Sequence, residues 1–358
     1  MELSTSLRAG ILAQLRAYPK MEITDLYKFL YQGARGCEHL APSPADATAR
    51  ILAEHAAWQP AERGGCEPLS DRYSRVPLSY LDAGLSAEVL AALLCRSARH
   101  EPSGEARLSE GLALAREMIV AGELPFSADA FDKSLAAWQE AGYPAVHHSA
   151  TFRHCYRPAY RVIANEYVRL LPLLTAIGRA LEGGRVLLAL EGGAASGKTT
   201  LAALLAELYG ATVVHTDDFF LQPAQRTPAR LAEVGGNLDR ERFLDEVLLP
   251  LHSGQAVCYR RFDCKTQKIL PATELTPARL TVVEGSYSMH PTLAPYYTLS
   301  AFLDIDPAYQ RERILVRNPG AYAERFFREW IPMEQAYFEG MRVKERCDLV
   351  IPIEKPTV

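Results

Sequence analysis

The sequence predicts an α/β fold in its second half, a parallel sheet with helices on both faces, preceded by a mostly α-helical region. We place the boundary near residue 180, which gives a helical domain over 1–180 and an α/β domain over 181–358. Two observations predict this division. Apolar residues recur at helical spacing in the first part, and short apolar runs alternate with helical stretches in the second. A chain of 358 residues is long enough for two domains.

Helical periodicity in the first half is clearest in four segments, Ile51–Trp58, Ala87–Arg99, Leu108–Ala121 and Phe131–Ala141. Ser86 and Ser127 precede two of them as N-caps, because a serine hydroxyl can accept a hydrogen bond from a free amide of the first turn. We expect a longer helix over Tyr160–Leu181. Gly183 and Gly184 follow it as a C-cap and domain junction.

The second half begins with Arg185–Leu190, a continuous apolar run typical of a strand buried on both faces. Further strands are expected at Ala211–His215, Leu280–Val283, Leu299–Asp304 and Asp348–Ile353. Helices are expected between them at Lys198–Leu208, Asp239–His252, Pro307–Arg317 and Tyr322–Lys344. Such alternation indicates βαβ units and a parallel sheet.

Composition and charge limit which binding partners and which cellular compartment we expect for this protein. The formal net charge is −4, without the basic excess of proteins that live on nucleic acid, so we expect no nucleic-acid partner. No apolar run reaches the roughly 18 residues that span a bilayer, and Glu2 makes the N-terminus a poor secretory signal. The seven cysteines form no C-x-x-C pair. We therefore expect a cytoplasmic protein with reduced thiols and no membrane partner; a homo-oligomer stays open.

The segment Gly192–Thr199 fits G-x-x-x-x-G-K-[ST] at each fixed position, between the first strand and the next helix. Glycines let the backbone wrap around an anion, and the helix N-terminus adds its positive end. We expect Lys198 to reach the β- and γ-phosphates and Thr199 to bind Mg²⁺. The sequence thus predicts ATP and Mg²⁺ as cofactors, and the flanking strand and helix disfavour a chance glycine turn. The expected nucleotide-binding residues are Gly192, Gly193, Ala194, Ala195, Ser196, Gly197, Lys198, Thr199 and Thr200.

Acidic residues end two later strands. Asp217 and Asp218 follow the second strand, at the edge where open α/β sheets bind ligands. Either carboxylate could orient an acceptor hydroxyl and take its proton. Glu284 ends an apolar strand and could hold Mg²⁺ or its water. The alternatives are a helix cap or surface turn at Asp217 and Asp218, and a capped turn at Glu284.

Arginines cluster around Asn318–Gly320, at positions 311, 313, 317 and 325. An arginine-bearing lid could close on a transferring phosphate and stabilise its charge, and we select Arg313 and Arg317 for this role. The alternative is an arginine-rich helix whose charges only face water.

Four segments together resemble the uridine kinase and phosphoribulokinase group of P-loop kinases. They are the glycine loop, Thr-Asp-Asp-Phe-Phe after the second strand, Phe262–Gln267 and Val-Val-Glu-Gly-Ser around Glu284. The resemblance covers roughly 185–358. It implies a P-loop NTPase-type fold and ATP-dependent phosphorylation of a hydroxyl on a small metabolite, with a nucleoside such as uridine as the first expectation.

The resemblance also implies individual roles. Asp217 matches the family's catalytic base, and Asp239 matches an aspartate that contacts sugar hydroxyls. Phe262 and Asp263 fall where the family contacts the acceptor base. We therefore expect these substrate-binding residues: Asp217, Asp218, Asp239, Phe262 and Asp263.

Three positions depart from the family pattern. Phe220 stands where a tyrosine often occurs, Gln267 where a histidine can contact the base, and Glu329 where glutamine is common. Because all three lie near the acceptor, a non-nucleoside alcohol such as pantothenate or ribulose phosphate remains an alternative. Two other classes stay open: a nucleotide-dependent regulatory ATPase that switches the first half, and a bifunctional protein whose first half has its own activity.

The first half carries no motif that we can name, but polar residues are dense over 147–161 and again at 36–39. Three interpretations compete. One is a metal site from Cys37, His39, His147 or His154. A second is an anion pocket built by the histidines with Arg153, Arg157 and Arg161. The third is a packed helical domain whose polar groups are hydrogen-bonded inside.

Overall fold

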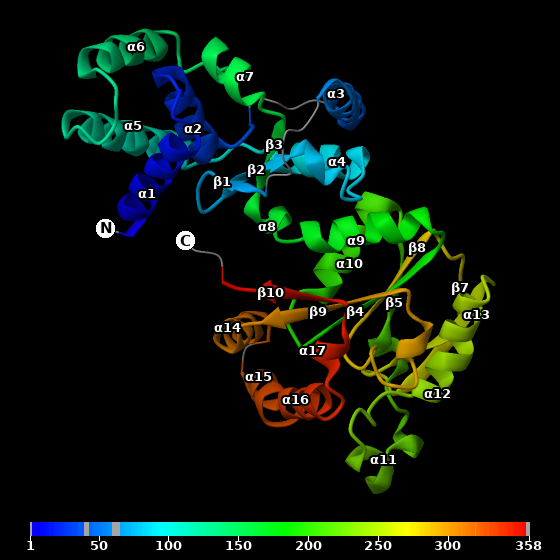
Figure 1. The fold of residues 1–358 in the computed structure, drawn as a ribbon. Coiled ribbons are helices and arrows are strands. Elements are labelled where there is room, and N and C mark those ends of the chain that lie inside the picture. Colours follow the sequence, from blue (N-terminus) through cyan, green and yellow to red (C-terminus); the bar gives the residue numbers. More distant parts are fainter. Residues whose placement is uncertain (1, 39–42, 59–64, 319, 356–358) are drawn as a thin grey trace. The chain divides into compact units, whose positions relative to one another are not determined.

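The computed structural model describes residues 2–38, 43–58, 65–318 and 320–355. The chain divides into two compact units, Met1–Leu171 and Pro172–Val358 (Figure 1). Helix α9 (Leu171–Glu182) therefore belongs almost wholly to the second unit.

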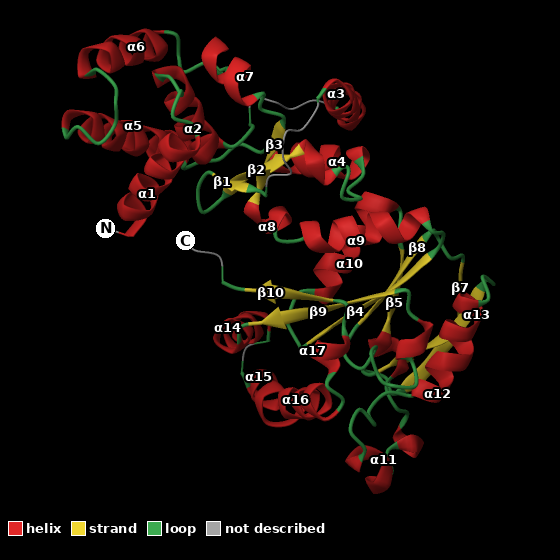
Figure 2. Ribbon diagram, in the orientation of Figure 1, coloured by secondary structure: helices red, strands yellow, loops and turns green. Residues whose placement is uncertain are grey.

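The first unit is mostly helical, as predicted (Figure 2). Its helices are α1 (Glu2–Ala17), α2 (Ile23–Arg35), α3 (Pro44–Ala57), α4 (Ala87–Ser97), α5 (Gly104–Val120), α6 (Ala128–Glu140), α7 (Ala150–Tyr156), α8 (Asn165–Val168) and the 3₁₀ turn η1 (Leu78–Tyr80). The predicted caps are confirmed, because the Ser86 and Ser127 hydroxyls accept hydrogen bonds from the amides of Val89 and Ala130.

The expectation of one helix over Tyr160–Leu181 is wrong at its start. Residues Tyr160–Ala164 form strand β3, which pairs antiparallel with β2 (Tyr73–Pro77), and β2 pairs in turn with β1 (Glu67–Pro68). The β-branched Val162 and Ile163 fit a pleated surface, and a partner strand far away in sequence fixes their conformation.

The second unit contains the predicted five-stranded parallel sheet, in the order β10-β9-β4-β8-β5. Its strands are β4 (Val186–Gly192), β5 (Thr212–His215), β8 (Leu280–Glu284), β9 (Leu299–Ile305) and β10 (Leu349–Ile353). Every residue of β4 and β8 is buried, which explains their continuous apolar runs. Two predicted helices are confirmed, as α10 (Lys198–Tyr209) and α14 (Pro307–Arg317). The predicted fold class is confirmed.

Two predicted helices of the second unit are interrupted by π turns. The first consists of α12 (Arg240–Phe243), η4 (Leu244–Leu248) and α13 (Leu249–His252). The second consists of α15 (Ala321–Arg325), η6 (Phe326–Trp330), α16 (Ile331–Gly340) and α17 (Val343–Arg346). Pro250 and Pro332 lie just after the two π turns. Proline has no backbone N–H, so it cannot donate the hydrogen bond that a regular helix makes at that position.

A β-hairpin that the sequence did not predict follows α13. It pairs β6 (Val257–Asp263) with β7 (Lys268–Leu275), with an irregularity between Arg260 and Phe262. Short turns complete the unit: η2 (Thr216–Phe219), η3 (Pro223–Gln225), α11 (Pro228–Ala232) and η5 (Ala294–Tyr296).

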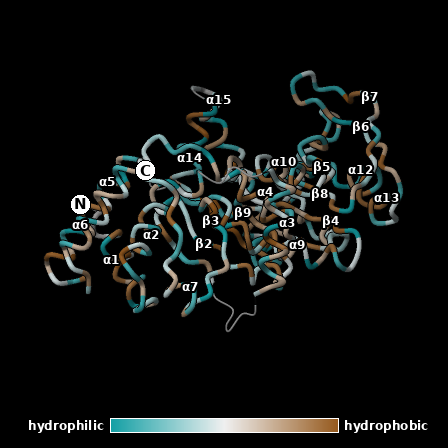
Figure 3. Tube along the Cα trace, turned by 90° about the horizontal axis from the view of Figure 1, so that it is seen from above, coloured by the Kyte–Doolittle hydropathy of each residue, from teal (hydrophilic) through white to brown (hydrophobic). Residues whose placement is uncertain are grey.

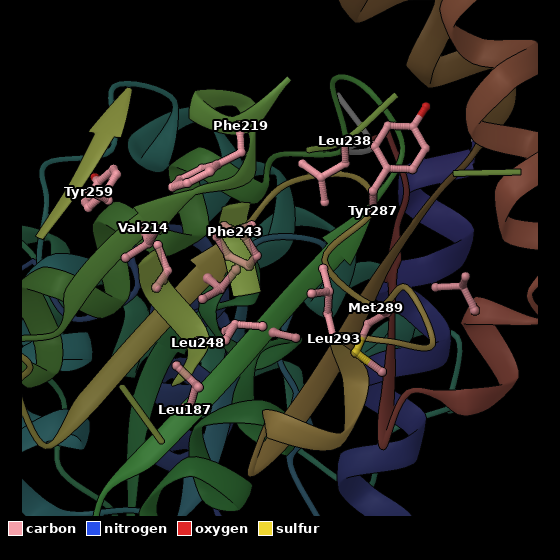
Figure 4. Close-up of a cluster of buried hydrophobic side chains, with 14 of the residues drawn as sticks. Leu187, Val214, Phe219, Leu238, Phe243, Leu248, Tyr259, Tyr287, Met289 and Leu293 are labelled. Atoms are coloured by element: carbon pink, nitrogen blue, oxygen red, sulfur yellow. The ribbon is translucent and has the colours of Figure 1, made fainter. Parts of the chain in front are cut away.

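A hydrophobic cluster fixes the turn that follows β5 (Figure 4). The Phe219 ring lies 4.8 Å from the Phe243 ring and 5.4 Å from the Tyr259 ring, between centroids. All three side chains are buried, and burying such a side chain stabilises the fold by about 1.5–3 kcal/mol. The cluster therefore holds η2 in place, together with the acidic residues that η2 carries.

Apolar stretches along the chain are short (Figure 3). Among the residues that the structure describes, no helix combines the length and hydropathy needed to cross a membrane.

Candidate active site at the edge of the parallel sheet

Strand β4 runs into the glycine loop, and α10 starts at Lys198. Gly192 has φ of 145°, and a Cβ there would lie 2.7 Å from the Leu303 carbonyl oxygen, so only glycine fits. The Lys198 ammonium group donates to the carbonyl oxygens of Gly192 and Gly193, at 2.7 and 3.0 Å. The loop thus curls around its own lysine.

The loop is anchored through Ala194. Its amide donates to the Glu334 carboxylate at 2.8 Å, and its carbonyl accepts from the Gln310 side chain at 2.8 Å. Ala195 has φ of 58°, and Thr200 lies in the first turn of α10. The Ser196 hydroxyl is buried and has no hydrogen-bond partner among the described residues. A phosphate oxygen in the loop would supply one, so the loop fits a nucleotide.

Thr199 and Glu284 meet at the ends of neighbouring elements. The Thr199 hydroxyl donates to Glu284 Oε1 at 3.1 Å, and His215 Nδ1 lies 2.5 Å from the same oxygen. Burial alone would raise the pKa of Glu284, but the hydrogen bond with His215 and the charges of His215 and Lys198 lower it on balance. Hydroxyl and carboxylate oxygens are ligands that Mg²⁺ prefers, so this pair fits the predicted metal. The sequence analysis did not single out His215.

Asp217 follows β5 in the turn η2. The protein around it desolvates its carboxyl, which raises its pKa. The charges of Lys198 and Arg317 act in the opposite direction, so both lie within electrostatic reach of Asp217. No other described residue donates a hydrogen bond to this carboxylate. The structure thus brings the predicted base and the P-loop lysine to one edge of the sheet.

Asp218 lies beside Asp217 and has one buried oxygen, Oδ2, that no described group contacts by hydrogen bond. Burial raises the pKa of Asp218, and the nearby positive charges of Arg261 and His215 oppose the shift. The charges of Asp217 and Asp218 also reach Cys264, at the tip of the β6–β7 hairpin. The hairpin tip therefore lies near the two carboxylates.

The other predicted substrate residues are placed differently. Asp239 is buried and caps α12, where it accepts hydrogen bonds from Arg242 and from Gln225. Phe262 is buried in β6. Both oxygens of Asp263 accept hydrogen bonds inside the hairpin turn, from the Lys265 amide and the Thr266 hydroxyl at 2.8 Å each. Their contact with an acceptor stays a prediction.

The four arginines after β9 separate into two pairs. The Arg313 guanidinium lies over the P-loop, 3.6 Å from where a Cβ on Gly197 would be, and the Arg317 charge reaches Asp217. Arg311 instead covers the Phe327 ring, and Arg325 pairs with Glu329 at 2.8 Å. Pro319, in the predicted lid, lies outside the described residues. The structure thus brings the two selected arginines to the site.

The sequence analysis missed Glu191, a fully buried carboxylate just before the loop. Burial raises its pKa to about 7, even though the amides of Gly192 and Met289 donate to it. The hydroxyls of Ser288 and Tyr337 also donate to it, at 3.2 and 3.1 Å. Glu191 thus ties the start of the P-loop to the segment after β8 and to α16. The signal in the sequence that could have revealed Glu191 was a single acidic residue in an otherwise apolar strand.

The predicted metal alternative in the first unit gains no support. The Cys37 thiol is buried and donates to the Val162 carbonyl at 3.4 Å. Within the described ranges, no group of three or more His, Cys, Asp and Glu side chains could hold a metal ion. His39 lies outside the described residues.

No model of a known protein family matches the sequence. Similar solved structures include a protein described as a possible uridine kinase from Bacillus stearothermophilus, at 20% identity, over 50% of this chain and 99% of that one, with a TM-score of 0.38. A proposed fructose transport system kinase from a Silicibacter species has 26% identity, over 47% and 89% of the two chains, with a TM-score of 0.40. D-glycerate 3-kinase from Cryptococcus neoformans has 14% identity, over 52% and 94%, with a TM-score of 0.38. Each of these similarities covers about half of this chain.

Proposed function

We propose that the second unit is a cytoplasmic kinase that transfers the γ-phosphoryl group of Mg-ATP to a hydroxyl of a small metabolite, with a nucleoside such as uridine as the first candidate. One observation carries the proposal. The Asp217 carboxylate accepts no hydrogen bond from the described residues and lies within electrostatic reach of Lys198, at the sheet edge where open α/β sheets bind ligands.

In this proposal the chain's own groups position the reactants. Lys198, the loop amides and the Ser196 hydroxyl bind the phosphates, and Thr199 and Glu284 hold Mg²⁺, which would neutralise phosphate charge. Asp217 accepts the proton of the acceptor hydroxyl while the hydroxyl oxygen bonds to the γ-phosphorus and ADP leaves. Desolvation makes Asp217 a stronger base, and the charges of Lys198 and Arg317 favour its ionised form.

Charge that develops on the transferring group needs fixed positive partners. Arg313 lies over Gly197 and Arg317 acts on Asp217, so the two guanidinium groups flank the path between donor and acceptor. On the acceptor side, the buried unpartnered oxygen of Asp218 suits a second hydroxyl of the metabolite. A polyhydroxylated acceptor, such as a nucleoside or another small molecule with several hydroxyl groups, fits this pair of carboxylates.

The test is a screen of nucleosides and other small alcohols with purified protein and Mg-ATP, read by the phosphorylated product. We expect one class of alcohol to react. If no nucleoside reacted but another alcohol did, the proposed kinase activity would be confirmed and the nucleoside would be excluded as the acceptor. If no alcohol were phosphorylated and ADP formed at the same slow rate with all of them, the protein would be a regulatory ATPase and the proposal would be wrong.

A further inference from the structure

The first unit contains a hollow of about 580 Å³ that the proposed kinase reaction does not use. Helix α2, the end of α3 and helix α7 with its flanking loops supply its walls, all within the first unit. A smaller hollow of about 190 Å³ shares Trp58, Arg157, Pro158 and Ala159 with it. The side chains that matter for its charge are Lys28, Glu54, His147, His148, Arg153 and Arg157.

The lining of the larger hollow has an excess of positive charge. Lys28, Arg153 and Arg157 face it, and none of them forms an ion pair with a carboxylate in the described part of the chain. Glu54, the single carboxylate among the described lining residues, pairs with Arg161 at 2.7 Å. Cations that gather in a concave site without partners favour an anionic ligand.

Lys28 is less exposed than the two arginines of this hollow. Its ammonium group is half-buried and donates to the Val146 carbonyl at 2.8 Å, which uses one of its three N–H groups. Asp25 acts on it electrostatically, but both oxygens of Asp25 are already bonded to His148 and Ser149. Lys28 therefore has donors to spare for a ligand.

Asp25 holds in place the part of the wall formed by His148 and helix α7. This buried carboxylate accepts hydrogen bonds from the Ser149 amide and hydroxyl and lies 2.8 Å from His148 Nδ1. Ser149 in turn caps α7, the helix that carries Arg153 and ends at Arg157. The His148 ring stacks on Phe152 at 4.0 Å. The two arginines are thus fixed to the same helix, α2, that presents Lys28.

Aromatic side chains line the smaller hollow, whereas cations line the larger one. The rings of Tyr18, Phe152 and Tyr156 form one wall, with centroids 4.8–5.0 Å apart. The almost fully buried Arg75 also lines this hollow and pairs with Glu67 at 3.1 Å. Its guanidinium also donates to the Gln32 side chain, at 2.9 and 2.8 Å, which offsets the cost of its burial. Aromatic rings beside such polar side chains suit the hydroxylated organic body of a small molecule.

We propose that the first unit binds a small molecule carrying a phosphate monoester, with the phosphate held by Lys28, Arg153 and Arg157 and the organic body in the smaller hollow. Three separate cations match the two charges and three free oxygens of a phosphate monoester better than the single charge of a carboxylate. The site stands on the residues of the first unit and does not depend on the kinase reaction, although a kinase would make a ligand of this class.

The test is calorimetric titration of the full-length chain with glycerol phosphate and ribose 5-phosphate, with saturating Mg-ADP to fill the P-loop. Glycerate is the carboxylate comparison. We expect at least one phosphate ester to bind, and the double variant Arg153→Ala/Arg157→Ala to bind it about a hundredfold more weakly, since two charge-assisted hydrogen bonds are lost. Arg16→Ala/Arg99→Ala, which removes two exposed arginines of the same unit, is the matched control and should bind normally.

Three results would overturn this proposal: no phosphate ester binds, glycerate binds as tightly as the esters, or the Arg153/Arg157 variant keeps wild-type affinity. The last result would place the bound ester in the second unit. Lys28→Met offers an independent check and should also weaken binding, with circular dichroism confirming that each variant folds. An Asp217→Asn chain should bind the ester normally, so failure of the kinase proposal can be told apart from failure of this one.

Discussion

The Thr199 hydroxyl donates a hydrogen bond of 3.1 Å to Glu284 Oε1, across 85 residues of sequence. The two meet because β4 and β8 are parallel neighbours, so the loop after β4 and the last residue of β8 lie at the same edge of the sheet. In the proposed reaction this pair would supply two oxygen ligands next to Lys198, and we expect it to set the Mg²⁺ requirement.

Glu284→Gln should raise the Mg²⁺ concentration for half-maximal rate by about 10- to 100-fold, because the amide keeps the size of the side chain but loses its charge. Initial rates across a Mg²⁺ series measure this. Glu274→Gln, at an exposed position on β7, is the control and should leave the requirement unchanged. An unchanged requirement in Glu284→Gln would remove Glu284 from the metal site.

The two arginine pairs should differ in their effect on turnover. Arg313→Ala should lower kcat by about 10²–10³-fold, since a cation over the P-loop stabilises charge only as it develops. Arg325→Ala should stay near the wild-type rate, because this arginine pairs with Glu329 within its own helix. Equal losses in the two variants would contradict the assignment of the lid.

Phe219 should matter for stability, because its ring packs between Phe243 and Tyr259 in the core. Phe219→Ala should lower the free energy of unfolding by about 3–5 kcal/mol. Urea unfolding followed by circular dichroism measures the change. The exposed Val316→Ala serves as control and should fall within about 0.5 kcal/mol of wild type. A small effect at Phe219 would mean that η2 is held by other contacts.

We expect His290 to make the folded protein less stable in mild acid. Burial, with the charges of Arg240 and Arg230, lowers the pKa of this histidine to about 4. An unfolded histidine titrates near 6.5, so between about pH 6.5 and 4 the unfolded state binds a proton that the folded state does not. The free energy of unfolding should therefore drop as pH falls through this window, by roughly 3 kcal/mol from this residue.

His290→Asn tests this pH dependence, because asparagine can still accept the hydrogen bond from the Thr292 amide but does not titrate. Urea unfolding at a series of pH values should show a flatter dependence in this variant than in wild type. His252→Asn, at an exposed histidine of the same unit, should keep the wild-type slope. A His290→Asn slope equal to that of wild type would contradict the account.

The parallel sheet could be predicted from sequence because its strands are buried on both faces and read as continuous apolar runs, as in β4. The hairpin could not, because the irregularity at Arg260 and Phe262 breaks the alternation that marks a half-exposed strand. Strand β3 depends on its pairing with β2, and local sequence does not reveal a distant partner.

Some residues of the candidate site could likewise be predicted from the sequence, and others could not. Its P-loop and Asp217 come just after strands and Glu284 ends one, so motif spacing places them. Glu334 reaches the Ala194 amide from α16, and His215 reaches Glu284 from the neighbouring strand. No local pattern tells which glutamate of a helix points toward a loop 140 residues earlier, because tertiary packing decides it.

The most direct test compares Asp217→Asn with wild type, for the acceptor that the screen identifies, by measuring transfer and ATP affinity on the same samples. The amide keeps the shape of the side chain but cannot take a proton, so we predict a loss of transfer of about 10²–10⁴-fold with nearly unchanged ATP affinity. Transfer at the wild-type rate in Asp217→Asn would contradict the proposed mechanism.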